Sequence, residues 1–293
     1  MLPLPAPCPN QQIAYPLRDG ITLWLKRLDL VHPTVTGNKY YKLNHNLRAA
    51  RRLGHDRLLT FGGAYSNHIA AVAAAGHAFG FATIGIIRGE ELIDKIAANP
   101  VLAQAQAHGM QLHFVSRSDY RRKAEAAFIE QLHQQFGAFY LLPEGGSNTL
   151  AVQGCSEILT AQDRQDFDVL CCAVGTGGTI AGLIEASSAT QTVLGFPALK
   201  GEFLQAEIAQ WTTRHNWQLC HDYHFGGYAK TSPELLAFVA DFAARTGIVI
   251  EPIYTGKLLY GVLDLVARGY FPAGSRILAI HSGGVQRPPQ AKV

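Results

Sequence analysis

The sequence predicts an α/β protein built on mainly parallel β-sheets. Two observations lead to this class: apolar runs of strand length recur along the chain, and helix-length segments that end near glycine lie between most of them. Such alternation produces βαβ units, in which ligands bind at the carboxyl ends of the strands. The composition agrees, because 293 residues with 48% apolar and 16% charged side chains suit a compact globular protein and exclude a disordered or fibrous one.

The expected elements follow one another regularly along the chain. Helices are predicted over 43–53, before Gly54, and over 235–245, before Gly247, because a left-handed glycine commonly ends a helix. The strand-length apolar runs are 58–61, 83–87, 112–115, 139–142, 169–174, 193–196 and 277–280. No fixed repeat and no Pro- or Ser-rich linker divides the chain, so a second domain would have to be inserted within the first.

Residues 69–87 contain no formally charged side chain and have the length of a membrane span. Gly76 and Gly80 interrupt them, and their character changes from alanine-rich to β-branched, so we predict a helix, a turn and a strand instead. The N-terminal residues lack the basic region and the sustained apolar run of a signal peptide. We therefore expect a cytoplasmic protein that does not bind membranes.

The charged and sulfur-containing residues narrow the class further. The net charge is +3, from 25 basic and 22 acidic side chains, and the short basic clusters do not form the dense stripe that nucleic acid requires. The five cysteines are scattered and form no CxxC pair, which predicts reduced thiols rather than a disulfide framework or a zinc site. We expect neither nucleic acid nor metal as a partner.

The most informative segment joins the apolar run 169–174 to a second apolar run at 180–184 through a loop of glycine and threonine. Glycines allow the backbone to approach an anion, and the free N–H groups at a helix start point towards it. The loop fits neither GxGxxG nor a P-loop, so it suggests a phosphate site for a ligand other than a nucleotide, with a tight strand–helix turn as the alternative. Its residues are Gly175, Thr176, Gly177, Gly178 and Thr179.

A second candidate is Lys39, which follows the turn-forming pair Gly37-Asn38 and precedes an amphipathic helix. The positive end of the helix dipole disfavours the charged form of an amine at this position, which suits a lysine that forms a Schiff base. A lysine that is simply exposed at a helix start is the alternative.

A third candidate lies in 59–68, where a strand again runs through glycines to a helix start. Ser66 and Asn67 suit the N-terminal cap of a helix over 69–75, and the free N–H groups there would hold a carboxylate. His68 is a candidate general base. Simple capping by Ser66 and a structural His68 are the alternatives.

Together these segments resemble one family of enzymes. The patterns Gly-Asn-Lys-x-x-Lys-Leu, Gly-Gly-x-x-Ser-Asn-His and Gly-Thr-Gly-Gly-Thr, in this order, are similar to those of the pyridoxal-phosphate enzymes that comprise 1-aminocyclopropane-1-carboxylate (ACC) deaminase and D-cysteine desulfhydrase. The resemblance continues at 143–148, 251–257 and 281–284 and so covers nearly the whole chain.

The resemblance implies a tryptophan synthase β-like fold, which is PLP fold type II, with two three-layer domains built on parallel sheets. Residues 1–55 and 148–293 would form the larger domain, which binds pyridoxal 5'-phosphate, and 56–147 a smaller inserted α/β domain. The family also implies a homodimer.

The family's functional residues carry over by position. Lys39 would form the Schiff base with the cofactor, Asn67 would bind its phenolic oxygen, and 175–179 would bind its phosphate. Ser66 would face the substrate carboxylate or act near the reacting carbon, with Tyr65 and His68 also on the substrate side.

Two tyrosines and two hydroxyl residues complete the implied site. Tyr254 matches a family active-site tyrosine, and Tyr228 matches a second one, although its flanking sequence departs from the family. Thr255 would contact the pyridine nitrogen, with Ser282 as the competing partner.

Several positions differ from the family pattern, and one bears on the reaction. Tyr40 and Tyr41 follow Lys39 where a small residue and arginine are usual, and Tyr65 replaces a common glutamine. Thr255 stands where ACC deaminases have glutamate. A hydroxyl leaves the pyridine nitrogen neutral, and the ring is then a weaker electron sink than one kept protonated by a carboxylate.

The sequence therefore predicts a pyridoxal-phosphate lyase or deaminase that acts on a small amino acid. Thr255 favours D-cysteine desulfhydrase-like α,β-elimination, which gives a 2-oxo acid and ammonia. The alternatives are ACC deamination, β-replacement as in O-acetylserine sulfhydrylase-like proteins, and a non-catalytic protein that binds the cofactor or a metabolite.

Overall fold

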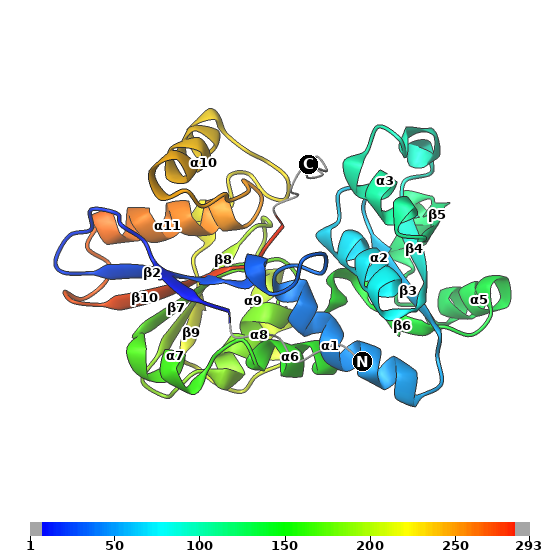
Figure 1. Cartoon of the computed structure of the whole chain (residues 1–293), viewed down its shortest axis with the longest axis horizontal. Helices are drawn as coiled ribbons and strands as arrows, with labels where there is room; N and C mark the ends of the chain where they lie inside the picture. The colour runs from blue at the N-terminus through cyan, green and yellow to red at the C-terminus, as the bar shows by residue number, and fades with distance from the viewer. Residues whose placement is uncertain (1–7, 285–293) are drawn as a thin grey trace. The chain divides into compact units, whose positions relative to one another are not determined.

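The computed structural model describes residues 8–284, and their contacts divide them into two compact units (Figure 1). Within the described residues, the first unit comprises 33–35 and 39–154, and the second comprises 8–32, 36–38 and 155–284. Each unit contains its own parallel or mainly parallel sheet with helices on both faces. The predicted α/β class is therefore confirmed.

The first unit is built on a parallel sheet with the strand order β5-β4-β3-β6. Alternate side chains of β3 and β4, such as Leu59 and Ile84, pack with Phe128 and Leu132 of α5. Gly85 faces the opposite side, where a Cβ would lie 3.5 Å from the end of the Ile69 side chain on α2. The strands are β3 (Arg57–Gly62), β4 (Ala82–Arg88), β5 (Gln111–Val115) and β6 (Tyr140–Leu142). The helices are α1 (Asn38–Arg52), α2 (Asn67–Phe79), η2 (Glu90–Lys95), α3 (Pro100–Ala107), α4 (Arg117–Arg121), α5 (Ala126–Phe136), η3 (Glu144–Gly146) and α6 (Thr149–Ser156).

The second unit is built on a six-stranded sheet with the order β1-β2-β10-β7-β8-β9, in which only the β1–β2 pair is antiparallel. Phe196 and Ala279 pack with Leu258 of α11, whereas a Cβ on Gly195 would lie 2.6 Å from Ile180 of α8 on the other face. The strands are β1 (Asn10–Gln12), β2 (Thr22–Arg27), β7 (Val169–Val174), β8 (Thr192–Pro197), β9 (Trp217–Leu219) and β10 (Arg276–His281). The helices are η1 (Leu28–Leu30), α7 (Ala161–Asp166), α8 (Gly178–Ala186), α9 (Phe203–Ala209), η4 (His221–Tyr223), α10 (Pro233–Thr246) and α11 (Thr255–Ala267).

The uncharged stretch 69–87 forms a helix, a turn and a strand, as the sequence predicts. Helix α2 ends at Phe79 because Gly80 takes the left-handed conformation, with φ of 70°, and β4 follows from Ala82. Gly76 does not break α2 but lets it approach β4, since a Cβ there would lie 2.3 Å from the Thr83 methyl group. In the part of the chain that the structure describes, no helix is both long and apolar enough to span a membrane.

The contacts place α1 with the first unit, whereas the boundary implied by the resemblance lies at residue 55. Helix α1 joins this unit because Lys42 donates hydrogen bonds to Gly145 and Ser147, and because Gly154 lies directly against the Tyr41 backbone. The domain limits 1–55 with 148–293, and 56–147, stay a prediction.

Candidate active site

The glycine–threonine loop lies at the carboxyl end of the buried strand β7 and leads into α8. Gly177 is the N-cap of this helix, with φ of 80° and ψ of −26°, and it provides no side-chain cap. The Thr179 hydroxyl accepts a hydrogen bond of 2.8 Å from the Asn38 side chain, the residue before Lys39. The loop thus has the positive φ and the glycine at the helix start that suit an anion site.

Lys39 is the second residue of α1, and the start of this helix depends on close backbone contact with the segment after β10. The Asn38 N–H donates to the Ser282 carbonyl at 3.1 Å. Gly37 has φ of 68°, and a Cβ there would lie 1.9 Å from the same carbonyl oxygen, so only glycine fits. Lys39 itself is half-buried.

The two lysines that rival Lys39 for the cofactor are both bound to backbone carbonyls. The Lys42 amine is buried and lies 2.9 Å from the Gly145 carbonyl and 2.9 Å from the Ser147 hydroxyl. The Lys257 amine is also buried and donates at 2.8 Å to the carbonyls of His224 and Gly227. These contacts argue against either amine as the Schiff-base lysine, and the role of Lys39 stays a prediction.

Ser66 caps α2 in the first unit, with its hydroxyl accepting a 3.3 Å hydrogen bond from the Ile69 N–H, and Asn67 is the first residue of the helix. A Cβ on Gly62 would lie 2.5 Å from the Ile69 side chain, so the glycine allows this tight strand–helix turn. Tyr65 directly before the cap is 63% exposed. Simple capping by Ser66 is thus observed, and its role towards a substrate stays a prediction.

His68 is the most deeply buried of the candidates in the first unit. Its side chain is 1% exposed, and neither ring nitrogen makes a hydrogen bond of acceptable geometry. Burial, followed by the charges of Lys39 and Lys42, holds the pKa of His68 well below its usual value, and an opposing effect of the Pro143 carbonyl is the smallest. Burial and the two neighbouring lysines therefore disfavour the protonated form of His68.

The two predicted tyrosines lie together in the second unit. The rings of Tyr254 and Tyr228 have centroids 6.2 Å apart at an angle of 61°, and Tyr228 is 40% exposed. Tyr254 also lies over the start of the glycine–threonine loop, since a Cβ on Gly175 would be 3.2 Å from its ring. The structure thus brings together a phosphate-type loop and two phenolic hydroxyls.

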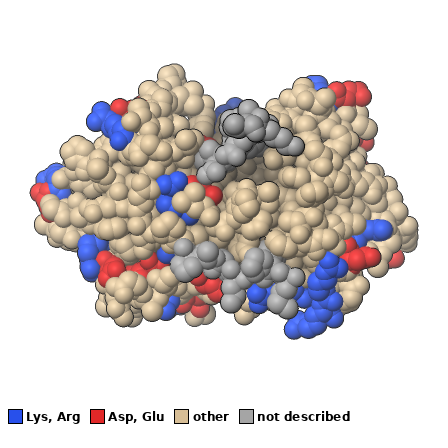
Figure 2. Space-filling view, viewed as in Figure 1, with Lys and Arg blue, Asp and Glu red and all other residues tan. Residues whose placement is uncertain are grey.

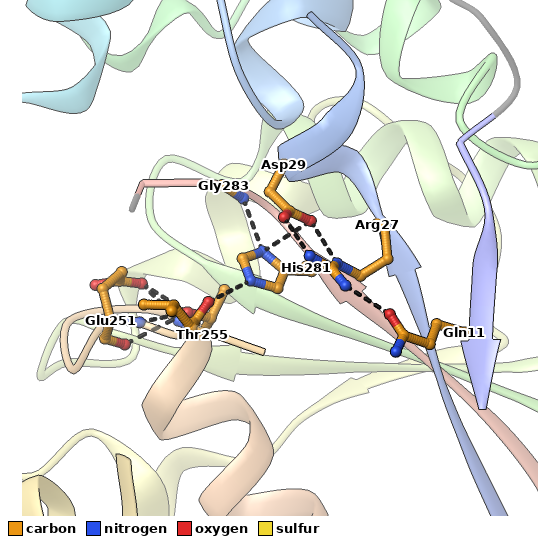
Figure 3. Close-up of polar contacts among 8 residues, drawn as sticks. Gln11, Arg27, Asp29, Glu251, Thr255, His281 and Gly283 are labelled. Atoms are coloured by element: carbon orange, nitrogen blue, oxygen red, sulfur yellow. Dashed lines mark hydrogen bonds and ion pairs between the residues drawn. The ribbon is translucent and has the colours of Figure 1, made fainter. Parts of the chain in front are cut away.

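Thr255 begins α11 and is fully buried, and its hydroxyl faces Glu251, a residue that the sequence did not single out. The Thr255 Oγ1 lies 3.1 Å from Oε1 of Glu251 (Figure 3). The same carboxylate accepts the N–H groups of Ile253, Tyr254 and Thr255 at 2.7 to 3.1 Å. Glu251 therefore caps α11, and its position four residues before the helix is the signal that would have found it.

A chain of polar side chains holds the segment that carries Ser282 (Figure 3). His281 is buried, and its Nε2 donates to the Val249 carbonyl at 2.9 Å, which leaves Nδ1 to accept the Gly283 N–H at 3.3 Å. Asp29 lies 3.7 Å from Nδ1 and accepts two hydrogen bonds from Arg27. Burial raises the pKa of Asp29, but the hydrogen bonds and the charge of Arg27 act against burial, and the pKa is lowered overall. The sequence contained no local signal for this chain of contacts.

Comparison with known proteins identifies the family. The sequence model described as "Pyridoxal-phosphate dependent enzyme" matches residues 14–283. The chain belongs to this family. It is therefore an enzyme whose cofactor is pyridoxal 5'-phosphate, as the sequence predicted.

Individual relatives support the narrower resemblance. The "Putative 1-aminocyclopropane-1-carboxylate deaminase" of Pyrococcus horikoshii is 29% identical over 284 residues, which cover 91% of this chain and 85% of the relative. The "Bifunctional D-cysteine desulfhydrase/1-aminocyclopropane-1-carboxylate deaminase, mitochondrial" of Arabidopsis thaliana is 29% identical over 298 residues, which cover 92% and 74%. The crystal structure of an ACC deaminase homologue matches with a TM-score of 0.81 and 27% identity, over 96% of this chain and 90% of the homologue. The resemblance and the tryptophan synthase β-like fold are confirmed.

The residues of the second unit fit the phosphate of this cofactor. We expect Gly177→Asp to weaken cofactor binding by about 1–3 kcal/mol, or roughly 5–150-fold in Kd, because the new carboxylate repels the phosphate and blocks its approach. Titration of the cofactor-free protein with pyridoxal 5'-phosphate measures the change.

Gly274→Asp is the matched control for this substitution. Gly274 lies in the same unit with φ of 77°, close to the 80° of Gly177, and a Cβ there would meet no atom within 4 Å. The control therefore introduces the same charge and the same backbone strain away from the loop. Equal cofactor affinity in the two variants would show that the loop is only a turn.

Proposed function

We propose that this enzyme is a lyase or deaminase that acts on a small amino acid, and that it catalyses D-cysteine desulfhydrase-like α,β-elimination. The observation that carries the proposal is the first turn of α11, where the hydroxyl residue Thr255 is bonded through its Oγ1 to Glu251, and the Glu251 carboxylate is itself occupied as a helix cap. No carboxylate of this turn is then left to protonate the pyridine nitrogen, whether Thr255 or Ser282 contacts it.

The reaction needs an acceptor for the Cα proton, and we assign this role to Lys39. The cofactor, when bound, withdraws electrons from the Cα of the substrate amine. The neutral amine of Lys39 takes the Cα proton, and the electron pair left on Cα forms the Cα–Cβ double bond as the bond from Cβ to the leaving group breaks. The released enamine hydrolyses to a 2-oxo acid and ammonia.

The remaining candidates bind the substrate or protonate the leaving group. Ser66 and Asn67, at the start of α2, hold the substrate carboxylate and the phenolic oxygen of the cofactor. The contact of Tyr228 with Tyr254 supports a phenol as the acid that donates a proton to the departing thiolate. His68 and Tyr65 line the substrate side in this proposal, where a neutral His68 accepts a hydrogen bond without adding charge.

The tyrosines beside Lys39 do not weigh against a small substrate. Tyr40 and Tyr41 are 1% and 3% exposed, and their rings lie edge to face, with centroids 6.2 Å apart. Both are therefore core residues of α1. We further propose that the enzyme is a cytoplasmic homodimer, as the resemblance implies.

We expect pyruvate and ammonia from D-cysteine and from β-chloro-D-alanine, and little or no 2-oxobutyrate from ACC. A neutral pyridine stabilises a carbanion only moderately, so a good leaving group departs faster than a cyclopropane opens. Product analysis of the purified enzyme with these substrates and the L-amino acids tests this, with Lys39→Ala as the inactive control.

The same assay separates the alternatives. ACC deamination is supported by the names of the relatives, and rapid 2-oxobutyrate formation would establish it and refute the electronic argument. Formation of a thioether in place of pyruvate when a thiol is added would establish β-replacement. Inactivity towards the whole panel would overturn the substrate class and leave the cofactor assignment in place.

A further inference from the structure

Lys257 is a buried cation held by backbone carbonyls. The side chain is 1% exposed, and its amine donates 2.8 Å hydrogen bonds to the carbonyls of His224 and Gly227. Among the described residues, no carboxylate lies within ion-pair distance of it. Burial lowers the pKa of Lys257, and the charge of Glu251 opposes this effect. Burial of an amine lowers the stability of the folded protein unless hydrogen bonds or ion pairs compensate for its lost hydration.

The backbone that Lys257 binds has an unusual conformation. Four residues of the loop have positive φ: Phe225 at 50°, Gly226 at 87°, Gly227 at 115° and Ala229 at 56°. For residues with a Cβ, such as Phe225 and Ala229, the left-handed region is unfavourable and persists only where surrounding contacts hold it. The loop therefore needs partners outside itself.

Two successive turns shape this loop, and Lys257 binds the carbonyl at the start of each. The Gly227 N–H donates to the His224 carbonyl at 3.0 Å, and the Lys230 N–H donates to the Gly227 carbonyl at 3.1 Å. These are the two oxygens that the Lys257 amine reaches. One amine thus connects both turns to α11.

Tyr228 lies in the second of these turns, directly after a carbonyl that Lys257 binds. Its ring contacts Tyr254, which precedes Lys257 by one helical turn. Helix α11 therefore holds this segment twice, through the Tyr254 ring and through the Lys257 amine. Loss of the amine would free the backbone on which the position of the Tyr228 ring depends.

We propose that Lys257 is a positioning residue, which fixes Tyr228 against Tyr254 by binding the two carbonyls of the left-handed loop 224–229. This inference rests on the proposed function, in which the two phenols act on the leaving group. Lys257 itself does not touch the reacting atoms in this scheme.

Hydrogen exchange measured by mass spectrometry tests whether Lys257 holds the loop 224–229, and this measurement does not depend on turnover. Lys257→Met keeps the apolar stem and removes the amine, and we expect faster exchange at 224–230 with unchanged exchange in β7 and β10. Lys257→Gln retains an amide donor and is the second variant if the methionine protein does not fold; it should show a smaller increase in exchange.

Asp264→Ala is the matched control. Asp264 lies two turns after Lys257 on α11 and accepts a 2.7 Å hydrogen bond from Tyr223 and a 3.4 Å one from Arg268, so this variant removes a contact with the neighbouring η4 turn and an ion pair within α11, but no contact with the carbonyls that Lys257 binds. Exchange at 224–230 should stay close to that of the parent enzyme. Unchanged exchange in Lys257→Met and Lys257→Gln would overturn the proposal.

A double-mutant cycle with Tyr228→Phe tests the connection to the phenol. We expect Lys257→Met to lower kcat for pyruvate formation by on the order of 10–100-fold with little change in KM, and to cause less than about a 2-fold loss when Tyr228→Phe is already present. Asp264→Ala should have the same small effect in both backgrounds. Equal losses from Lys257→Met in both backgrounds would reduce Lys257 to a general structural role and overturn the proposal.

The two measurements separate this inference from the proposed function. Exchange at 224–230 could increase in Lys257→Met while Tyr228→Phe keeps the parental activity. This result would support the binding of the loop by Lys257 and refute the catalytic role of Tyr228. An enzyme inactive on the whole substrate panel would refute the proposed reaction, and the exchange data alone would then decide on Lys257.

Discussion

Replacement of Lys39 by alanine is expected to abolish covalent attachment of the cofactor and to lower kcat by at least about 10³-fold, since one amine serves as both nucleophile and base. The visible absorbance band of the purified enzyme should disappear. Borohydride reduction of the parent enzyme, followed by peptide mapping, should place the cofactor on the peptide that contains Lys39. Lys39→Arg should behave like alanine, because a guanidinium retains the charge but does not act as the nucleophile.

Two kinds of control make this result specific. Lys95→Ala removes an exposed lysine at the end of η2 and should leave both the label and the rate unchanged. Lys42 and Lys257 are bound to backbone carbonyls, so neither should carry the label. Recovery of the reduced cofactor on either of them would refute the assignment of Lys39.

Asp163→Asn is expected to lower the free energy of unfolding by about 3–5 kcal/mol, because it leaves a buried ammonium without its counter-charge. The Asp163 carboxylate is fully buried and lies 2.6 Å from the Lys26 amine, and it also accepts from Asn10 at 2.6 Å and from the Thr160 N–H at 2.7 Å. Urea denaturation at pH 7 measures the loss.

Asp241→Asn provides the comparison with an exposed pair. Asp241 binds Arg245 at 2.7 Å in the same unit, but both side chains are about half exposed, so the loss should stay within about 1 kcal/mol. Equal losses in the two variants would show that burial does not set the cost.

The contribution of Asp163 should also depend on pH. Burial raises the pKa of Asp163, but hydrogen bonds from Lys26, Asn10 and Thr160 outweigh burial and lower it overall from the model-compound value of 3.8. A lowered pKa stabilises the folded state above the unfolded-state pKa, and the stabilisation is lost as the pH falls through the folded-state pKa. The difference between the parent enzyme and Asp163→Asn should therefore be constant from neutral pH to about pH 5 and should decrease below about pH 4.

Features that depend on neighbouring residues could be predicted from the sequence. The buried strands were found because parallel strands covered on both faces are continuous apolar runs, and β7 was predicted at the residues 169–174 where it occurs. The loop after it was identified because glycine is needed for a positive φ, as Gly177 shows. The cofactor followed from several motifs in register, and the family match confirms it.

The strands that the sequence missed lack this local signal. β2 contains Lys26 and Arg27 and therefore does not resemble a central strand; Lys26 is buried there because Asp163, 137 residues away, neutralises it. β1 and β9 have three residues each and contain glutamine, so neither forms the apolar run by which the equally short β6 was found.

The sequence by itself thus determined the α/β class, the family and the cofactor, because these depend on periodicity and on short motifs. Only the tertiary structure decided the protonation and the partners of the polar side chains. The pKa of His68 is lowered because its ring is buried, and because Lys39 and Lys42 lie near it. Lys257 likewise has its proposed positioning role only because the fold brings the carbonyl of Gly227, 30 residues away, to 2.8 Å from its amine. Burial and charge pairing depend on groups far apart in the chain, and no local pattern records which groups will meet.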